Sequence, residues 1–245
     1  MELRVAHLYP NMMNIYADRG NIIALERHCA WRGISFSVTG FGLDDDISWR
    51  DYDFFYLGGG QDRDQRLVSE DLRAKGSGLA EAVEEGAVVL SVCGGYQLLG
   101  EYYVTGAGDR MEGVGLFRAH TVAGSDRCIG NVVVRSDIGC LDLTLAGFEN
   151  HAGRTFLAPG QQPLGKVVSG FGNNAVDGTE GIVYLNAIGT YLHGPLLPKN
   201  PGLAEYLLLQ ALRHRYGDGV GPLSPIDLSL EEEAHGVAVR VAGGG

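Results

Sequence analysis

Hydrophobic and polar positions in the first half of the chain follow two patterns in alternation. Short apolar or alternating runs predict β-strands at residues 3–9, 34–39, 53–57 and 87–92. Helical spacing and glycine stops predict one helix over residues 21–32, a second that ends in residues 79–85 and a third that begins in residues 96–100. Strands that alternate with helices predict an α/β fold with an open, doubly wound, mostly parallel sheet flanked by helices, and the apolar run at residues 87–92 is expected at its buried centre.

The second half of the chain is richer in strand patterns. Additional strands are predicted at residues 115–122, 131–136, 144–149, 182–186 and 189–192, and a final helix at residues 202–216. Residues 217–225 are rich in Gly and Pro and are typical of a linker, and residues 229–245 are expected to form a short helix or to remain loose. We therefore expect one domain over residues 1–216, followed by a C-terminal linker and tail over residues 217–245.

Composition and charge narrow the class of protein. Of the 245 residues, 45% are hydrophobic and 20% are charged, which is typical of a soluble globular protein. The formal net charge is −11 and no basic cluster interrupts it, so we expect no nucleic-acid partner. No signal peptide and no run of about 18 apolar residues is present, so we expect a cytoplasmic protein without direct membrane insertion.

Two kinds of bound group are not expected. The four cysteines form no CxxC pair, which makes a structural metal site or a disulfide framework a poor interpretation. The sequence contains neither a GxxxxGK[ST] loop nor a GxGxxG turn after a strand. We therefore expect no metal, no nucleotide and no other cofactor bound by this chain.

The most informative stretch is the end of the central apolar strand. Residues 88–92 run directly into Cys93, which is followed by Gly94 and Gly95 and by the start of a helix. A sharp strand-to-helix turn exposes a nucleophile above the sheet, and the backbone N–H groups that follow it are free to bind an oxyanion. A buried structural cysteine before a tight turn is the plainer alternative. The nucleophile elbow of α/β-hydrolases is a closer competitor, but it has glycine two residues before the nucleophile, where this chain has Ser91.

These residues carry a resemblance to a known family. The run Cys-Gly-Gly-Tyr-Gln at residues 93–97 resembles the nucleophile motif of class I glutamine amidotransferases, in the branch that includes cobyric acid synthase. Residues 56–62, 127–131 and 148–155 are similar to motifs of the glutaminase subunits of lipid II isoglutaminyl synthases within that branch. The resemblance spans residues 3–216. It implies a flavodoxin-like amidotransferase fold and hydrolysis of L-glutamine through a thioester on Cys93.

A cysteine nucleophile of this kind needs a histidine as its base. His193 is the best candidate among seven histidines, because residues 189–195 have the pattern of an apolar strand that ends in histidine at a loop, and the family has the same Thr-Tyr-Leu-His-Gly run. His7 is expected to be structural, and His28 and His214 lie in helical patterns and are expected at the surface or a boundary. Many class I amidotransferases place a glutamate two residues after the histidine, but this chain has Pro195.

The missing glutamate leaves alternatives open. Either a cysteine–histidine dyad suffices, or a carboxylate that orients His193 comes from elsewhere in the chain or from a partner. We hypothesise that the partner supplies it, so that glutamine hydrolysis is silent until the complex forms.

The resemblance also implies an oxyanion hole and a substrate grip. The N–H of Gly94 is one expected oxyanion donor, and Gly59 or Gly60 is expected to supply the second. Gln97 resembles the family glutamine that contacts bound substrate. Arg127 suits the α-carboxylate of glutamine, because guanidinium presents a planar fork of donors. His151 is expected either to contact the substrate or only to shape the pocket.

Amidation of a carboxylate requires activation, and the lack of an ATP motif indicates that another polypeptide performs it. The resemblance implies a heterodimer with an ATP-using Mur-ligase-like synthetase, which receives the ammonia and amidates the D-glutamate of lipid II to D-isoglutamine in peptidoglycan biosynthesis. Three alternatives stay open: an amidotransferase subunit for another carboxylate such as a cobalamin precursor, a non-catalytic regulatory subunit that keeps the fold, and a cysteine peptidase or deglycase.

Overall fold

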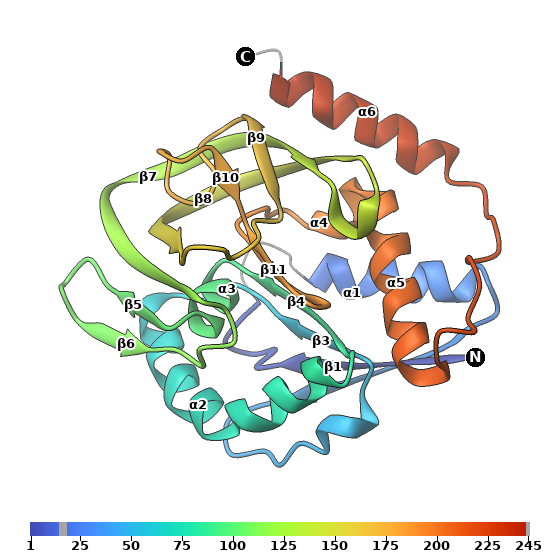
Figure 1. The fold of residues 1–245 in the computed structure, drawn as a ribbon, viewed down its shortest axis with the longest axis horizontal. Helices are drawn as coiled ribbons and strands as arrows, with labels where there is room; N and C mark the ends of the chain where they lie inside the picture. The colour runs from blue at the N-terminus through green and yellow to red at the C-terminus, as the bar shows by residue number, and fades with distance from the viewer. Residues whose placement is uncertain (15–18, 244–245) are drawn as a thin grey trace.

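The computed structural model describes residues 1–14 and 19–243 and contains two sheets with helices around them (Figure 1). In the first, sheet A, the strands lie in the order β11-β12-β4-β3-β1-β2, and every neighbouring pair is parallel except β11 with β12. The strands are β1 (Glu2–Leu8), β2 (Ser35–Phe41), β3 (Phe54–Leu57), β4 (Val88–Val92), β11 (Ile182–Tyr184) and β12 (Ala187–Thr190). The predicted open, mostly parallel sheet is confirmed, with β4 near its middle.

Helices cover both faces of sheet A, because alternate residues of its strands enter different hydrophobic cores. Phe54 and Tyr56 of β3 pack with residues of α1 and α5, whereas Phe55 and Leu57 pack with residues of α2 and α3. The sheet is therefore doubly wound, as predicted. The helices are α1 (Arg19–Ala30), α2 (Asp62–Glu84), α3 (Gly94–Leu99), α4 (Leu196–Lys199), α5 (Pro201–Tyr216) and α6 (Ser229–Gly243), with short 3₁₀ turns η1 (Trp49–Asp51) and η2 (Ile138–Cys140).

The second sheet, sheet B, comes mainly from the second half of the chain. Its order is β10-β9-β7-β5-β6, and β8 also pairs with β7. The strands are β5 (Tyr102–Val104), β6 (Arg110–Glu112), β7 (Ala119–Ser136), β8 (Leu143–Leu157), β9 (Gly165–Ser169) and β10 (Thr179–Glu180). An isolated bridge between Phe148 of β8 and His193, just beyond β12, joins the two sheets. The expected extra strands are thus present as a sheet of their own.

The strand predictions for sheet B need correction. Of the two separate strands predicted at residues 115–122 and 131–136, residues 119–122 and 131–136 belong to a single strand, β7, and residues 115–118 precede it. The pairing of β7 with β8 shifts between Ala123 and Cys128. This irregular segment contains Gly, Ser, Asp and Arg, which interrupt the apolar pattern without ending the strand. The short strands β5, β6, β9 and β10 have too few apolar residues to be recognised by periodicity, and they were not predicted.

One histidine prediction is also wrong. His28 was expected at the surface or a boundary, but it is 3% exposed. Its Nδ1 lies 2.5 Å from Glu205 Oε1 of α5, and Arg32 contacts the same carboxylate. The helical pattern of α1 does not reveal that α5 packs across it and buries this charged cluster. His7 lies in β1 and is 6% exposed, consistent with a structural role.

The end of the chain forms a helix rather than a loose tail. The helix α6 lies across the outer side of sheet B, where it contacts β7, β8 and α4 (Figure 1). His235 Nδ1 donates to the carbonyl oxygen of Lys199 at 2.7 Å. Residues 244–245 of the predicted tail lie outside the described residues, and the boundary between residues 216 and 217 stays a prediction.

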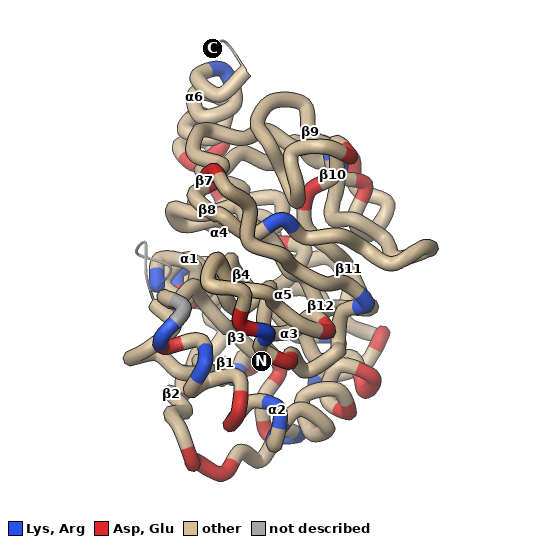
Figure 2. The backbone as a smooth tube through the Cα atoms, turned by 90° about the vertical axis from the view of Figure 1, so that its left-hand side faces the viewer, with Lys and Arg blue, Asp and Glu red and all other residues tan. Residues whose placement is uncertain are grey.

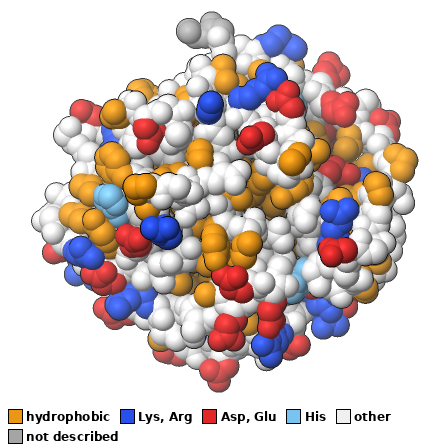
Figure 3. All heavy atoms as spheres, viewed as in Figure 1, with side chains coloured by type: hydrophobic (Ala, Val, Ile, Leu, Met, Phe, Trp, Pro, Cys, Tyr) orange, Lys and Arg blue, Asp and Glu red, His pale blue; other side chains and the backbone are white. Residues whose placement is uncertain are grey.

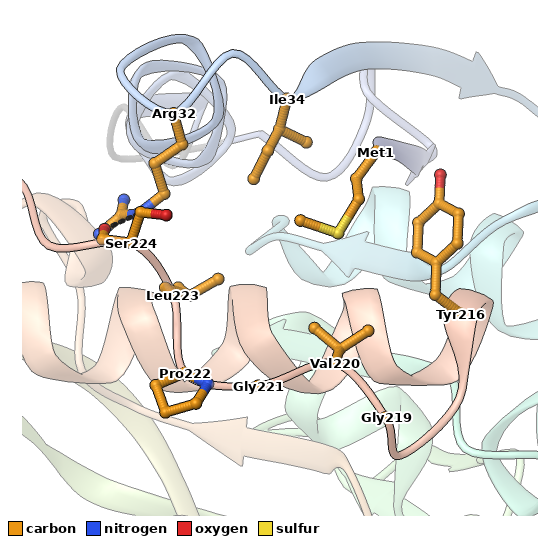
Figure 4. A pocket seen from close by; sticks show the side chains of 10 residues that line it. All are labelled: Met1, Arg32, Ile34, Tyr216, Gly219, Val220, Gly221, Pro222, Leu223 and Ser224. Atoms are coloured by element: carbon orange, nitrogen blue, oxygen red, sulfur yellow. Dashed lines mark hydrogen bonds between the residues drawn. The ribbon is translucent and has the colours of Figure 1, made fainter.

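Charges are spread over both sheets without a continuous basic stripe in the view of Figure 2. None of the helices in residues 1–14 and 19–243 is long and apolar enough to cross a membrane. A cavity of about 530 Å³ lies where residues 219–224 pass the first residue of the chain and the end of α1 (Figure 4). Its ten lining residues include none of the side chains predicted for catalysis.

Candidate active site

Cys93 stands at the turn between β4 and α3, as the sequence predicted. Its backbone has φ 52° and ψ −108°, a conformation that L-residues rarely adopt, and its side chain is half-buried. Its N–H donates to Thr190 O of β12 at 2.9 Å, and its carbonyl oxygen accepts the N–H of Gln97 at 3.0 Å. The strained residue is therefore held from two sides, which is typical of functional turns.

The two glycines after Cys93 are required by close packing. A Cβ atom on Gly95 would lie 2.5 Å from Leu57 O, and the N–H of Gly95 donates to Gly58 O at 3.0 Å. A Cβ atom on Gly94 would lie 3.0 Å from the backbone nitrogen of Gly60. The nucleophile turn is thus pressed against the glycine loop that follows β3.

A cleft of about 510 Å³ opens beside Cys93. Five of the predicted site residues line it, namely Gly60, Cys93, Gln97, Arg127 and His151. The other three, Gly59, Gly94 and His193, are not among its lining residues. The fold therefore brings most of the predicted constellation to one cavity, although these residues are spread over almost a hundred positions of the chain.

His193 lies where the two sheets meet. Its N–H donates to Phe148 O at 2.8 Å and its carbonyl oxygen accepts the N–H of Phe148 at 3.2 Å, so β8 fixes its backbone. The side chain is 1% exposed. Burial, followed by the neighbouring His151 and Arg127, lowers the pKa of His193 to about 3. The imidazole is neutral at physiological pH and is able to accept a proton.

Arg127 lies on β7 and is exposed at the rim of the cleft. Its Nε and one terminal nitrogen donate to Asn150 Oδ1 at 3.0 and 2.7 Å, and the same terminal nitrogen donates to Asn150 O at 2.9 Å. The neighbouring strand β8 therefore holds the guanidinium group in place before a ligand binds. Binding then loses little side-chain entropy of Arg127.

His151 is buried at the wall of the cleft. Its ring stacks on the ring of Tyr191 with centroids 3.7 Å apart and an interplanar angle of 7°. Its Nδ1 donates to Gly153 O at 2.7 Å, and its Nε2 lies 3.6 Å from Glu149 Oε2. The Glu149 carboxylate accepts the backbone N–H groups of Phe171 and Gly172 at 2.7 and 2.9 Å.

Gln97 is connected to the protein through Tyr191. Gln97 Nε2 donates to the Tyr191 hydroxyl at 3.1 Å. That hydroxyl lies 2.7 Å from Thr155 Oγ1, which in turn lies 2.7 Å from Thr121 Oγ1. The other three residues in this chain of hydrogen bonds are buried in sheet B or just beyond the end of β12.

Comparison with known proteins identifies the family. A model of the CobB/CobQ-like glutamine amidotransferase domain matches residues 4–201. The chain belongs to the CobB/CobQ-like glutamine amidotransferase family. It is 42% identical over 220 residues to the lipid II isoglutaminyl synthase (glutamine-hydrolyzing) subunit GatD of Streptococcus pneumoniae, covering 89% of this chain and 84% of that protein. It is 40% identical over 240 residues to the subunit of the same name from Staphylococcus aureus, covering 98% of this chain and 95% of that protein.

A solved structure agrees at the level of the fold. A crystal structure of a glutamine amidotransferase aligns with a TM-score of 0.54 at 15% sequence identity, covering 84% of this chain and 98% of that chain. The family assignment matches the resemblance inferred from residues 93–97, 127–131 and 148–155.

Sequence reasoning missed three residues of this amidotransferase site. Asn150 and Tyr191 lie inside motifs that the sequence analysis used, but their contacts are not visible in a motif. Glu180 gave no sequence signal. It is fully buried, accepts the Tyr191 N–H at 2.7 Å and the Thr190 hydroxyl at 3.0 Å, and burial raises its pKa to about 8. It fixes the backbone just before His193.

Proposed function

We propose that the chain is the glutaminase subunit of a lipid II isoglutaminyl synthase and hydrolyses L-glutamine to glutamate and ammonia. Cys93 is the nucleophile and His193 is its base. The observation that carries the proposal is the strained Cys93 between β4 and α3, exposed to a cleft that Gln97 and Arg127 also line. Family membership and the names of the two GatD relatives support the same reaction.

The reaction proceeds in two halves. His193 takes the thiol proton, and the Cys93 sulfur attacks the carboxamide carbon of glutamine to form a tetrahedral oxyanion. The C–N bond then breaks, the proton on His193 passes to the nitrogen, and ammonia leaves a thioester on Cys93. His193 next takes a proton from water, and the hydroxyl attacks the thioester to form a second oxyanion. The C–S bond then breaks to release glutamate, and the proton on His193 passes to the sulfur of Cys93. The general base in this scheme starts as a neutral imidazole, and the lowered pKa of His193 favours that form.

Backbone donors stabilise the oxyanion in this proposal. The N–H of Gly94 is one donor, and Gly60 is favoured over Gly59 as the second, because Gly60 lines the cleft and its nitrogen faces Gly94. A single donor of this kind contributes about 10²–10³ in rate.

Side chains at the rim hold the rest of the substrate. Arg127 binds the α-carboxylate of glutamine with the guanidinium edge that Asn150 leaves available. Gln97 contacts the substrate from the floor of the cleft. His151 mainly shapes the wall, because its Nδ1 is bonded to Gly153 and its ring is stacked on Tyr191.

The ammonia is consumed by a partner in this proposal. An ATP-using Mur-ligase-like synthetase in the cytoplasm forms a heterodimer with the chain and amidates the D-glutamate of lipid II. Exposed hydrophobic side chains on β7, β8 and β9 and in the loop after β9 offer a surface for a partner, among them Ile129, Phe148, Val168 and Phe171. On the face seen in Figure 3, hydrophobic side chains lie in groups between charged ones.

The source of the acid that orients His193 is part of the proposal. Two buried carboxylates of the chain, those of Glu149 and Glu180, accept hydrogen bonds from the backbone of residues 171–172 and from Thr190 and Tyr191. We keep the hypothesis that the orienting carboxylate comes from the synthetase. Equal rates of glutamine hydrolysis with and without the synthetase would reject this idea.

The nucleophile is tested by ammonia release from glutamine, measured for the wild type and Cys93→Ala, each mixed with the synthetase. Cys93→Ala is expected to lose at least about 10³-fold in rate, because no other thiol can form the acyl intermediate. Cys140→Ala is the matched control, since Cys140 is exposed and does not line the cleft. Unchanged turnover in Cys93→Ala would reject the proposed mechanism. Amidation of a cobalamin precursor instead of lipid II would reject lipid II as the acceptor.

A further inference from the structure

The buried hydroxyl of Tyr191 makes contacts that the proposed reaction does not yet use. Tyr191 is 0% exposed and lies two residues before His193, just beyond the end of β12. Its hydroxyl stands between Gln97 Nε2 at 3.1 Å and Thr155 Oγ1 at 2.7 Å. It therefore connects a residue that lines the cleft to the interior of sheet B.

Either hydroxyl can donate in the two bonds between hydroxyl groups, so the donor Gln97 Nε2 sets the direction of this chain of hydrogen bonds. When Gln97 Nε2 donates to the Tyr191 oxygen, the Tyr191 proton is directed to Thr155, and the Thr155 proton to Thr121. Thr121 and Thr155 are 2% and 1% exposed, so water does not compete for these bonds. A buried donor or acceptor that loses its partner destabilises the fold by more than a satisfied hydrogen bond stabilises it. This penalty keeps all three hydrogen bonds formed together.

The hydrogen bond from Nε2 to Tyr191 leaves the other end of the Gln97 amide, Oε1, for the cleft. Nε2 is taken by Tyr191, and no hydrogen bond to Oε1 is formed by any residue in the described part of the chain. Oε1 is also absent from the deeply buried polar atoms, although Gln97 lines the cleft. The oxygen is therefore the end that a ligand meets, and it accepts hydrogen bonds only.

Close packing keeps this arrangement in place. A Cβ atom on Gly153 would lie 2.4 Å from Gln97 Nε2 and 2.9 Å from the Tyr191 hydroxyl. Only glycine leaves room at this position for the bond between them. The ring of Tyr191 is also fixed, because it stacks on His151 on one side and meets Tyr96 at 5.2 Å edge to face on the other.

We propose that Tyr191 is a positioning residue that orients the Gln97 amide, so that Gln97 Oε1 accepts a hydrogen bond from an N–H group of the substrate. The inference rests on the proposed function, because glutamine supplies such donors as its α-ammonium group and its carboxamide. Tyr191 does not line the cleft and acts through Gln97 in this role.

The test compares two buried tyrosines that lose the same hydroxyl. Tyr191→Phe is expected to raise the KM for L-glutamine by about three- to tenfold with kcat changed less than about twofold, because one neutral hydrogen bond that fixes the amide is lost. Tyr96→Phe is the matched control: its hydroxyl is equally buried, but it donates to Asn173 Oδ1 at 3.1 Å and does not touch Gln97. It is expected to leave KM unchanged.

Binding is measured separately from turnover. In a Cys93→Ala background, calorimetry with L-glutamine is expected to give the same three- to tenfold loss of affinity for Tyr191→Phe. Should Tyr191→Phe fail to fold, Thr155→Val serves instead, because it removes the acceptor of the Tyr191 proton and frees the amide to flip. An unchanged KM and Kd in both variants would overturn the inference.

The orientation of the amide has its own test. Gln97→Glu presents an acceptor oxygen whichever way the group rotates, so Tyr191→Phe is expected to have a smaller effect on KM in the Gln97→Glu background. Gln97→Glu binding glutamine more weakly than Gln97→Ala would show that the cleft needs a donor, and would overturn the inference. Glutaramate, which lacks the α-amine, distinguishes the two possible donors of the substrate. If Tyr191→Phe leaves the KM for glutaramate unchanged, the α-ammonium group of glutamine is the donor to Gln97 Oε1. If Tyr191→Phe raises the KM for glutaramate, the carboxamide is the donor.

Failure of this inference differs from failure of the proposed function. A wild-type complex that releases no ammonia from glutamine rejects the function. A wild type and Tyr96→Phe that turn over normally, beside a Tyr191→Phe with unaltered KM, reject only the role of Tyr191.

Discussion

The buried carboxyl group of Glu180 makes stability depend on pH in a direction opposite to that of most acids. Its pKa in the folded state is about 8, against 4.5 for the unperturbed group, because burial disfavours the charged form more than its hydrogen bonds favour it. The folded protein thus holds a proton that the unfolded chain releases between these two values. Stability is full below about pH 4.5 and falls as pH rises towards 8.

The size of the effect follows from the pKa difference. A complete shift from 4.5 to about 8 corresponds to at most about 5 kcal/mol. Relaxation and water entry reduce this penalty in real proteins, so we expect about 2–3 kcal/mol between pH 5 and pH 8. Glu180→Gln removes the ionisable group and keeps an oxygen for the Tyr191 N–H. The variant is therefore expected to gain about 2–3 kcal/mol relative to the wild type when pH is raised from 5 to 8.

Urea denaturation of both proteins at pH 5, 6, 7 and 8 measures this difference directly, because every other titrating group is shared and cancels. Thr190→Ser is the matched control, since it keeps both the carboxyl group and the hydroxyl that donates to it. The control is expected to follow the wild-type slope. A stability difference between Glu180→Gln and the wild type that is the same at pH 5 and pH 8 would refute the reasoning.

Three other perturbations probe the site and its support. Gly95→Ala places a Cβ atom against backbone carbonyl oxygens that cannot rotate away, so we expect a loss of about 2–4 kcal/mol by urea denaturation, whereas Gly106→Ala, with open space around it, is expected to change little. Arg127→Lys removes the planar guanidinium group that Asn150 holds in place. Steady-state kinetics should show a KM for glutamine raised about tenfold with kcat retained. A raised KM in Asn150→Ala as well supports a role of Asn150 in positioning Arg127. Burial lowers the pKa of His7 to about 4, so the stability of the fold should fall as pH drops from about 6.5 towards 4. His7→Leu should reduce this loss of stability at low pH by about 2 kcal/mol. The same dependence of stability on pH in His7→Leu and the wild type would contradict the prediction.

The first half of the fold was predictable because its pattern is local. Residues 87–92 are apolar except for Ser91 and are followed by Cys93 and two glycines, and they form β4 and the turn at Cys93 as expected. Parallel strands that are buried on both faces need runs of apolar residues, and the helices between them need apolar residues at helical spacing. Both patterns can therefore be recognised within short windows of sequence. The position of the candidate nucleophile follows from the same windows.

Sheet B and the surroundings of the site were not predictable in this way. The strand β7 continues through a polar, irregular segment because fourteen of its residues pair with β8, and the apolar pattern of β7 alone does not show this pairing. His28 is buried because α5 crosses α1, and Glu180 is buried because β10 and β12 meet. The contact between His28 and Glu205 joins residues 177 positions apart, and even the shorter contacts of Glu180 with Thr190 and Tyr191 connect β10 with β12 and the residue after it.

The sequence by itself determined the alternation of strands and helices, the turn that presents Cys93, and the chemistry that His193, Arg127 and Gln97 have to offer. Only the tertiary structure decided which of these groups share a cleft, and how Tyr191 orients Gln97. The physical reason is that periodicity and turn chemistry are properties of neighbouring residues. The burial, the hydrogen-bond partners and the pKa of a residue depend on which side chains from other segments surround it. These surroundings form only when the two sheets pack together.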